Sequence, residues 1–294
     1  MSDAPRTWTI LEMLRWTAEY LAGKGFDEPR LNAELLLSGA LGVKRLDLYL
    51  QFDRPLTDEE IAEFRSRLLR RARSEPLQYI AGHADFREIR LHVDRRVLIP
   101  RPETELLVGE ILSWSRGRNG LSVLDVGTGS GAIALSLAVE GSFDRIVASD
   151  ISEDALAVAR RNLEEIAPDT SVELLAGGTY QAVRGEHFDV IVSNPPYIGE
   201  HERSDLDAEV RDWEPSTALF SGSDGLDMIR DLVEGAEEHL KPGGFLALEI
   251  GAGQGAAVCR MIRETGRFGE PALIRDLSGR ERMVTAELAG SPAE

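Results

Sequence analysis

The sequence contains very little of the residues that build disulfide frameworks, metal centres and membrane spans. Its single cysteine, Cys259, excludes an internal disulfide and a cysteine-rich zinc site. Its five histidines show no metal-ligand spacing, so no bound metal is expected. No window approaches the roughly 18 apolar residues of a transmembrane helix, and the N-terminus lacks the basic and apolar stretches of an export signal. These shortages predict a cytoplasmic protein without a metal or a membrane anchor.

Basic residues are scarce in only one part of the chain. The formal net charge is −18; residues 1–118 carry 19 basic and 19 acidic side chains, whereas residues 119–294 carry 14 and 32. An acidic field repels a phosphate backbone, which proteins normally bind through Lys and Arg. Direct binding of nucleic acid is therefore disfavoured, although the acidity could equally serve solubility alone.

The length of 294 residues predicts about two domains. Residues 1–75 have apolar side chains at helical spacing and a capping-box pattern at Thr57–Glu60, which predicts a small helical bundle. Residues 76–99 are richer in β-branched and aromatic residues and predict a β-hairpin linker with a turn at Asp94–Arg96. Residues 100–294 form the remaining domain, which opens with a proline-rich helix start.

Short apolar runs alternate with helical segments from residue 121 onward. The candidate strands are LSVLDV, RIVAS, VELLA, FDVIVS, FLALEI and MVTAEL. This alternation indicates an α/β fold with a parallel sheet covered by helices on both faces. The stretches PALIRDL and ERMVTAEL have no clear helix between them, so an antiparallel hairpin is expected at one edge of the sheet.

A glycine-rich loop follows the first of these strands. The stretch VLDVGTGSGAIALSLA leaves a strand, crosses the glycines and enters a helix, so its backbone can approach a ligand closely. The spacing also satisfies a dinucleotide fingerprint. Asp125 would repel a pyrophosphate but suits the cationic methionine end of S-adenosylmethionine; a buried structural carboxylate is the alternative. The residues expected to bind this cofactor are Asp125, Gly127, Thr128, Gly129, Ser130 and Gly131.

Asp150 ends the next strand, 19 residues beyond Gly131. A carboxylate at this position can accept hydrogen bonds from both hydroxyls of a ribose. Asp150 or Ser152 could instead cap the helix that is expected to begin near Glu153. Both roles remain open for Asp150.

The stretch FDVIVSNPPYI carries the most specific chemistry in the sequence. An apolar strand delivers Asn194, Pro195, Pro196 and Tyr197 to the carboxyl edge of the sheet, and the prolines stiffen the loop. The amide oxygen of Asn194 and the carbonyl of Pro195 could accept two hydrogen bonds from one planar NH2 group, on which Tyr197 could stack. Orientation and electrostatics would then supply most of the catalysis of a methyl transfer. The NH2 group of Asn194 would be free to contact the cofactor.

The chain resembles the release factor glutamine methyltransferases, the HemK/PrmC family, over nearly its whole length. The shared motifs are EPLQYIAG at 75–82, LIPRPETE at 98–105, DVGTGSG at 125–131, SNPPYI at 193–198, EIGAGQG at 249–255 and RDLSGRERMV at 275–284. The resemblance implies a class I, Rossmann-like methyltransferase domain that uses S-adenosylmethionine. It also implies methylation of the glutamine side-chain amide in the Gly-Gly-Gln motif of class-1 peptide-chain release factors. We expect a monomeric enzyme whose residues 1–75 dock this protein substrate.

Carried over position by position, the resemblance assigns the substrate glutamine to Asn194–Tyr197. It assigns cofactor contacts to the glycine loop, Asp150 and Asn194. The family often has an acidic residue and an aromatic near the adenine, where this chain has Gly178 and Thr179. Thr179 is therefore the expected adenine contact, and Tyr180 could compensate for the missing ring.

Charged residues of two further motifs have no derived role. The resemblance puts Arg101, Glu103 and Glu105 beside the active site, as support for the cofactor cleft or for the loop at Asn194. Glu249 could border the same cleft or stand as an edge carboxylate without a ligand.

The main rival is a methyltransferase for an exocyclic amine of nucleic acid, such as N6 of adenine, because the same tetrapeptide suits a flipped base. The acidic charge of residues 119–294 argues against it. A binding module without activity would not need the acceptors of Asn194 and Pro195, and a dinucleotide oxidoreductase conflicts with Asp125.

Overall fold

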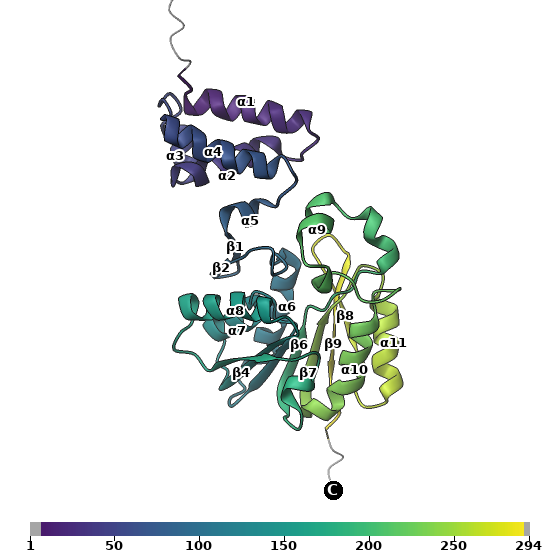
Figure 1. Cartoon of the computed structure of the whole chain (residues 1–294). Helices are drawn as coiled ribbons and strands as arrows, with labels where there is room; N and C mark the ends of the chain where they lie inside the picture. Colours follow the sequence, from purple (N-terminus) through teal and green to yellow (C-terminus); the bar gives the residue numbers. More distant parts are fainter. Residues whose placement is uncertain (1–6, 291–294) are drawn as a thin grey trace, which may run out of the picture. The chain divides into compact units, whose positions relative to one another are not determined.

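The computed structural model describes residues 7–290 and divides the chain into two compact units (Figure 1). The N-terminal unit contains Met1–Gly82 and Ala208–Trp213, and the sheet unit contains His83–Asp207 and Glu214–Glu294. Within the described residues, no helix has the length and apolar character needed to cross a membrane.

The N-terminal unit is the helical bundle that the sequence predicted. Its helices are α1 (Ile10–Gly23), α2 (Pro29–Leu41), α3 (Arg45–Leu50), α4 (Asp58–Arg71), α5 (Leu77–Ala81) and α9 (Ala208–Trp213). The capping box before α4 is confirmed, because the Thr57 hydroxyl accepts from the Glu60 amide while the Glu60 carboxylate accepts from the Thr57 amide. Helix α9 joins this unit through the Arg71–Glu209 ion pair and a 3.2 Å hydrogen bond from the Trp213 indole to the Arg73 carbonyl.

Two features of residues 76–99 differ from the prediction. Leu77–Ala81 is helical rather than extended. Gly82 then ends this helix in the left-handed conformation, at φ 79°. The hairpin of β1 (His83–Phe86) and β2 (Ile89–His92) turns immediately after Phe86, at Arg87, and not at Asp94–Arg96.

The turn at Arg87 depends on partners that are distant in the sequence. Arg87 adopts φ 48°, and its amide donates to the Glu105 carboxylate over 3.1 Å. Its guanidinium pairs with the Glu140 carboxylate at 2.6 and 2.8 Å. These tertiary contacts hold a left-handed residue that local sequence rules do not favour.

The sheet unit is built on seven strands in the order β5-β4-β3-β6-β7-β9-β8. Their bounds are β3 (Ser122–Val126), β4 (Arg145–Asp150), β5 (Val172–Ala176), β6 (Phe188–Ser193), β7 (Leu240–Glu249), β8 (Ala272–Arg275) and β9 (Glu281–Glu287). The strands from β5 to β7 pair in parallel, and β8 and β9 form the antiparallel edge that was predicted. The strand order reverses between β3 and β6, which is where such sheets bind ligands.

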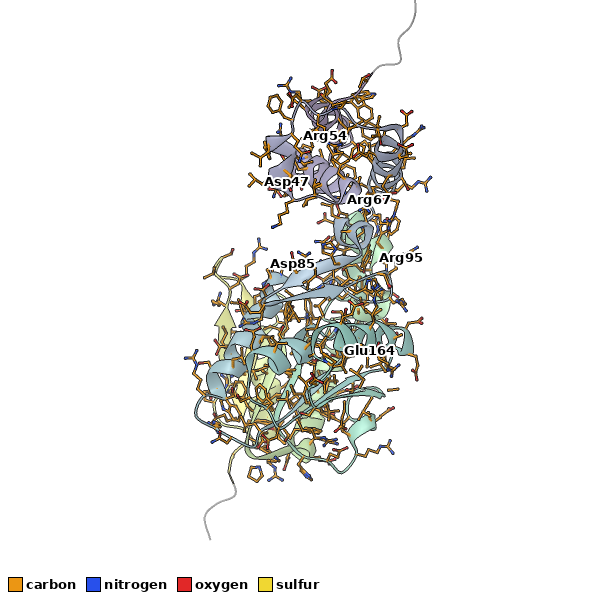
Figure 2. The ribbon with its side chains drawn as sticks, turned by 90° about the vertical axis from the view of Figure 1, so that its left-hand side faces the viewer. Asp47, Arg54, Arg67, Asp85, Arg95 and Glu164 are labelled. Carbon is orange, nitrogen blue, oxygen red and sulfur yellow. The ribbon has the colours of Figure 1, made fainter. Side chains whose placement is uncertain are left out.

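Helices cover both faces of this sheet (Figure 1). On one side lie α10 (Asp227–His239) and α11 (Gly255–Thr265), and on the other α6 (Pro102–Trp114), α7 (Ala132–Glu140) and α8 (Glu153–Ile166). Short 3-10 turns occur at Gln181–Val183, Glu200–Asp205 and Ser216–Ala218. Cys259 of α11 is in the apolar core, as expected. Asp85 and Glu164, both labelled in Figure 2, are exposed to solvent, whereas the central strands consist mostly of buried apolar residues.

Candidate active site

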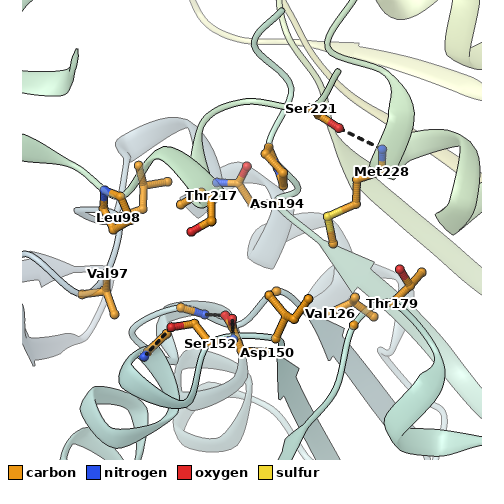
Figure 3. A pocket seen from close by; sticks show the side chains of 18 of the residues that line it. Val97, Leu98, Val126, Asp150, Ser152, Thr179, Asn194, Thr217, Ser221 and Met228 are labelled. Carbon is orange, nitrogen blue, oxygen red and sulfur yellow. Dashed lines mark hydrogen bonds between the residues drawn. The ribbon is translucent and has the colours of Figure 1, made fainter. Parts of the chain in front are cut away.

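A cavity of about 370 Å³ lies at the carboxyl ends of β3, β4 and β6 (Figure 3). This volume falls within the roughly 300–1,000 Å³ of typical small-molecule sites. Predicted site residues on its wall are Gly127, Gly129, Asp150, Thr179, Asn194 and Pro196. Wall residues that sequence reasoning missed include Val97, Leu98, Ile151, Thr217, Ser221 and Met228. They come from loops and from α10, so no single motif could have gathered them.

The glycine loop is held in a conformation that requires glycine. Gly127, Gly129 and Gly131 have φ angles of 73°, 56° and 85°, where a side chain would be strained. The amides of Gly127 and Thr128 both donate to the Ser149 carbonyl, at 2.8 and 2.9 Å. Thr128 and Ser130 are buried behind the loop, so Gly127 and Gly129 are its cavity-facing residues.

Asp150 lies on the cavity wall with its carboxylate anchored by backbone amides. One oxygen accepts from the Gly129 amide and the other from the Ser152 amide, each at 2.9 Å. The Ser152 hydroxyl accepts from the Ala155 amide at 3.2 Å, so Ser152 is the cap of α8. A carboxylate has about four acceptor positions, and two remain at Asp150 for a ligand such as a ribose.

Asp125 is fully buried beneath the loop and is not on the cavity wall. Its Oδ2 accepts from the Thr128 hydroxyl at 2.6 Å and from the Ala134 amide at 3.2 Å. Its Oδ1 is buried and has no hydrogen-bond partner among the described residues. Burial raises the pKa of Asp125 to about 7. The geometry gives Asp125 a structural role in the loop, and its contact with a cofactor stays a prediction.

Asn194 is placed at the cavity by the end of β6. The Ser193 hydroxyl donates to the Val126 carbonyl at 2.7 Å and so ties the ends of β6 and β3 together. The Asn194 amide nitrogen donates to the Thr104 hydroxyl oxygen at 3.0 Å. The sequence analysis expected this NH2 group to be free for the cofactor. That expectation is wrong for the N–H bond that donates to Thr104 and stays a prediction for the other. The amide oxygen of Asn194 remains available as an acceptor.

Thr104 connects Asn194 to a buried carboxylate. Its hydroxyl donates to Glu249 Oε2 at 2.6 Å, and the Tyr197 hydroxyl lies 3.5 Å from Glu249 Oε1. Burial raises the pKa of Glu249 to about 7. Burial, together with the Glu249 charge, also raises the pKa of Tyr197. Tyr197 packs against the core, and its predicted stacking on a substrate is not tested by this geometry.

Thr104 contacts Asn194 and was not singled out from the sequence, although it lies within the PRPETE motif. The buried face of α6 consists of Thr104, Leu107, Val108 and Ile111. These positions have helical spacing, so this face was readable from the sequence.

The charged residues beside Thr104 connect the start of α6 to other segments. Arg101 pairs with Glu214 at 2.6 Å and Glu103 with Arg282 at 3.3 Å, while Glu105 accepts from the Arg87 amide.

Tyr180 does not compensate for the missing aromatic residue beside Thr179. Its hydroxyl donates to the Leu232 carbonyl at 2.7 Å, and its ring stacks on His239 with centroids 4.4 Å apart. Thr179 does line the cavity, at φ 40°. The apolar wall of the cavity includes Ile151 and Met228 instead.

Among residues 7–290, no group of three or more His, Cys, Asp or Glu could hold a metal ion.

Known protein families match both the N-terminal helical region and the sheet-containing region of the chain. The family model described as PrmC N-terminal domain matches residues 12–82, and that described as methyltransferase small domain matches residues 103–210. A release factor glutamine methyltransferase of Geobacter sulfurreducens is 44% identical over 284 residues, covering 97% of this chain and 98% of that protein. One from Rhodopirellula baltica is 38% identical, covering 98% of each.

A solved methyltransferase from Pyrococcus furiosus has the same fold. It superposes with a TM-score of 0.53 at 22% identity, covering 77% of this chain and 98% of that one. The predicted α/β fold, a Rossmann-like methyltransferase domain preceded by a helical region, is confirmed.

Proposed function

The chain belongs to the release factor glutamine methyltransferases and is an S-adenosylmethionine-dependent enzyme, and we propose that it methylates the glutamine of the Gly-Gly-Gln motif in class-1 peptide-chain release factors. One observation carries the assignment of the chemistry to Asn194. Its NH2 group is engaged by Thr104, which leaves its amide oxygen as an acceptor at the wall of the cavity. An acceptor there suits a substrate NH2 group.

The cavity fits the cofactor by its donors and acceptors. Gly127 and Gly129 allow close backbone approach, and Asp150 keeps acceptor positions for ribose hydroxyls. Asp125 lies beneath the glycine loop and off the cavity wall, so a direct contact between its Oδ1, which has no hydrogen-bond partner among the described residues, and the cationic end of the cofactor is left to experiment. S-adenosylmethionine, when bound, supplies an electrophilic methyl group and becomes S-adenosylhomocysteine. We propose no metal, since none is needed to hold or polarise either reactant.

Asn194 and Pro195 are proposed to hold the substrate amide nitrogen. The Asn194 side-chain oxygen and the Pro195 carbonyl would accept one hydrogen bond each from the glutamine NH2 group. Two acceptors orient the nitrogen for in-line attack and spread the positive charge that develops on it. The nitrogen gains the methyl carbon and releases one proton to solvent. Pro196, on the cavity wall, and Tyr197, which packs against the core, are proposed as further contacts of the substrate.

The N-terminal unit is proposed to dock the release factor. Its helices α1 and α4 border an apolar hollow of about 380 Å³. The hollow is lined by Trp8, Met13, Trp16, Tyr20, Ile61, Phe64, Arg65, Leu68 and Leu69. Trp16 is 45% exposed and Leu69 50% exposed, and exposed apolar clusters mark protein-binding surfaces. We expect a monomeric enzyme in the cytoplasm, where translation factors act.

The test is transfer of radiolabelled methyl groups to a class-1 release factor, with DNA and tRNA offered in parallel. We expect label on the release factor only, placed on the Gly-Gly-Gln glutamine by mass spectrometry. A release factor with that glutamine changed to alanine is the matched control and should stay unlabelled. Label on an exocyclic amine of nucleic acid would establish the rival function.

A further inference from the structure

The side-chain amide of Asn194 can be placed in two orientations of nearly equal shape. A rotation of the amide by about 180° exchanges its oxygen and its NH2 group, so an acceptor becomes a donor. Only the orientation with the oxygen toward the substrate can accept from a glutamine NH2 group. Something in the protein must therefore select this orientation.

The contacts around Thr104 make this selection. The Glu249 carboxylate, when ionised, can only accept hydrogen bonds. The Thr104 hydroxyl has one proton and donates it to Glu249 Oε2 at 2.6 Å. Its oxygen can then only accept from Asn194, which presents its nitrogen at 3.0 Å. Thr104 is 3% exposed and Glu249 2% exposed, so water does not compete for these bonds.

We infer that Thr104 and Glu249 are positioning residues that fix the Asn194 amide with its oxygen toward the substrate. The inference rests on the proposed role of Asn194 as the acceptor for the glutamine NH2 group. Glu249 acts at a distance, because its charge determines which way the Thr104 proton points. Neither residue needs to touch a reactant.

Protonation of Glu249 removes the selection. A neutral carboxyl can donate to the Thr104 oxygen, and the Thr104 proton is then free to turn toward Asn194 and favour the flipped amide. The charged or titratable groups that face Glu249 are Glu103, Arg282 and the Tyr197 hydroxyl, and Arg101 faces Tyr197. Burial outweighs the attraction of Arg282 and raises the pKa of Glu249 to about 7. The active form is the ionised one, so kcat rises with pH through this pKa.

The first experiment compares Thr104→Val with Thr104→Ser in single-turnover methylation of a release factor at saturating cofactor. Valine keeps the shape but removes the hydroxyl, and we expect kcat to fall about 10-fold to 100-fold, less than for loss of the acceptor itself. Serine keeps the hydroxyl and should stay close to wild type. The Kd for S-adenosylmethionine and the Tm should be similar in both. Equal losses of kcat in the two variants would overturn the inference.

The second experiment follows kcat against pH in Glu249→Gln and Glu249→Leu. Wild-type kcat should be about tenfold lower near pH 6 than near pH 8, because a group with a pKa of about 7 changes its ionised fraction by that factor. Glutamine cannot titrate, and it can present either its oxygen or its NH2 group to Thr104, so we expect a kcat without this pH dependence that lies between wild type at pH 8 and Glu249→Leu. Leucine removes the acceptor and should lower kcat at every pH.

These outcomes separate two failures. If Glu249→Gln keeps the wild-type pH profile, the positioning role of Glu249 is wrong while the enzyme remains a glutamine methyltransferase. If wild-type enzyme places no methyl group on the glutamine, the proposed function itself fails.

Discussion

The two units of the chain differ in what they present to solvent. The N-terminal unit carries 13 basic and 15 acidic residues, and the sheet unit carries 20 and 36. Among the described residues, large exposed apolar side chains are concentrated in the smaller unit, where Trp16, Leu46, Leu50 and Leu69 are 45–71% exposed. In the sheet unit one of the few such residues, Ile151, lines the cavity.

This difference indicates a division of work. A nearly neutral surface with exposed apolar side chains suits a protein partner. An acidic unit whose cavity at the strand ends is lined by Asp150 and Asn194 suits chemistry on a small, cationic cofactor. Substitutions in the two units should therefore change different kinetic constants.

The largest effect is expected at Asn194. Asn194→Ala removes the proposed acceptor and should lower kcat by about 10²–10³-fold, the usual loss for one aligned electrostatic contact in a closed site. Cofactor affinity should change much less. Asn194→Asp should retain more activity, because it keeps an acceptor. Single-turnover methylation of a release factor at saturating cofactor measures this, and a near wild-type rate for Asn194→Ala would mean that the tetrapeptide is only a structural turn.

Asp150→Ala should act on the cofactor instead. The change removes the proposed acceptor for ribose hydroxyls and the anchor of the Gly129 amide. Hydrogen bonds to a charged group contribute about 1.5–3 kcal/mol, so the Kd for S-adenosylmethionine should rise by about 10-fold to 100-fold. Calorimetry measures this. Asp144→Ala, an exposed aspartate just before the amino end of the same strand, is the matched control. Unchanged affinity in Asp150→Ala, or tighter binding of NAD, would refute the cofactor assignment.

Substitution of Trp16 together with Leu69 by alanine tests the docking role. Exposed aromatic anchors in interfaces often contribute 1–2 kcal/mol or more, so KM for the intact release factor should rise about tenfold while kcat is unchanged. The full chain is needed, since Ala208–Trp213 packs in the N-terminal unit. Val139→Ala, at an equally exposed site of the sheet unit, should change neither constant. A fall in kcat with KM unchanged would contradict the division of work.

The smallest effect is expected at Asp125. Its pKa is about 7 in the folded protein against an ordinary value of 3.8, so the folded state binds this proton more tightly than the unfolded state. Stability from this group is therefore greatest below the unfolded pKa and is lost as pH rises toward about 7. Glu249 contributes with the same sign.

Asp125→Asn should remove most of this dependence. We expect the difference in Tm between about pH 5 and about pH 8 to be smaller in the variant than in wild type by a few degrees. The variant should gain Tm relative to wild type mainly at the higher pH. Thermal unfolding followed by circular dichroism measures it, and calorimetry on the same variant tests the separate prediction that Asp125 contacts the cofactor. An unchanged Tm difference would show that Asp125 does not hold the raised pKa.

Local patterns in the sequence were sufficient for the fold class and for bringing several candidate site residues to one cavity. Apolar runs alternating with helical periods predicted the parallel sheet, and its carboxyl edge gathers the glycine loop, Asp150 and Asn194 as expected. This works because backbone hydrogen bonding and one-sided burial impose short, regular spacings on a chain. The motif at Asn194, together with the PRPETE stretch and the helical N-terminal region, also pointed to the correct family.

Tertiary structure alone decided how the polar groups are paired. Thr104 meets Asn194 across 90 positions of the chain and Glu249 across 145, and Tyr180 turns away from the cavity to a carbonyl of α10. Such hydrogen bonds depend on strand order and on where helices dock, and neither leaves a local spacing in the sequence. Burial at those contacts then determines which carboxylates hold their protons near neutral pH, because desolvation is a property of the packed molecule and not of the residue.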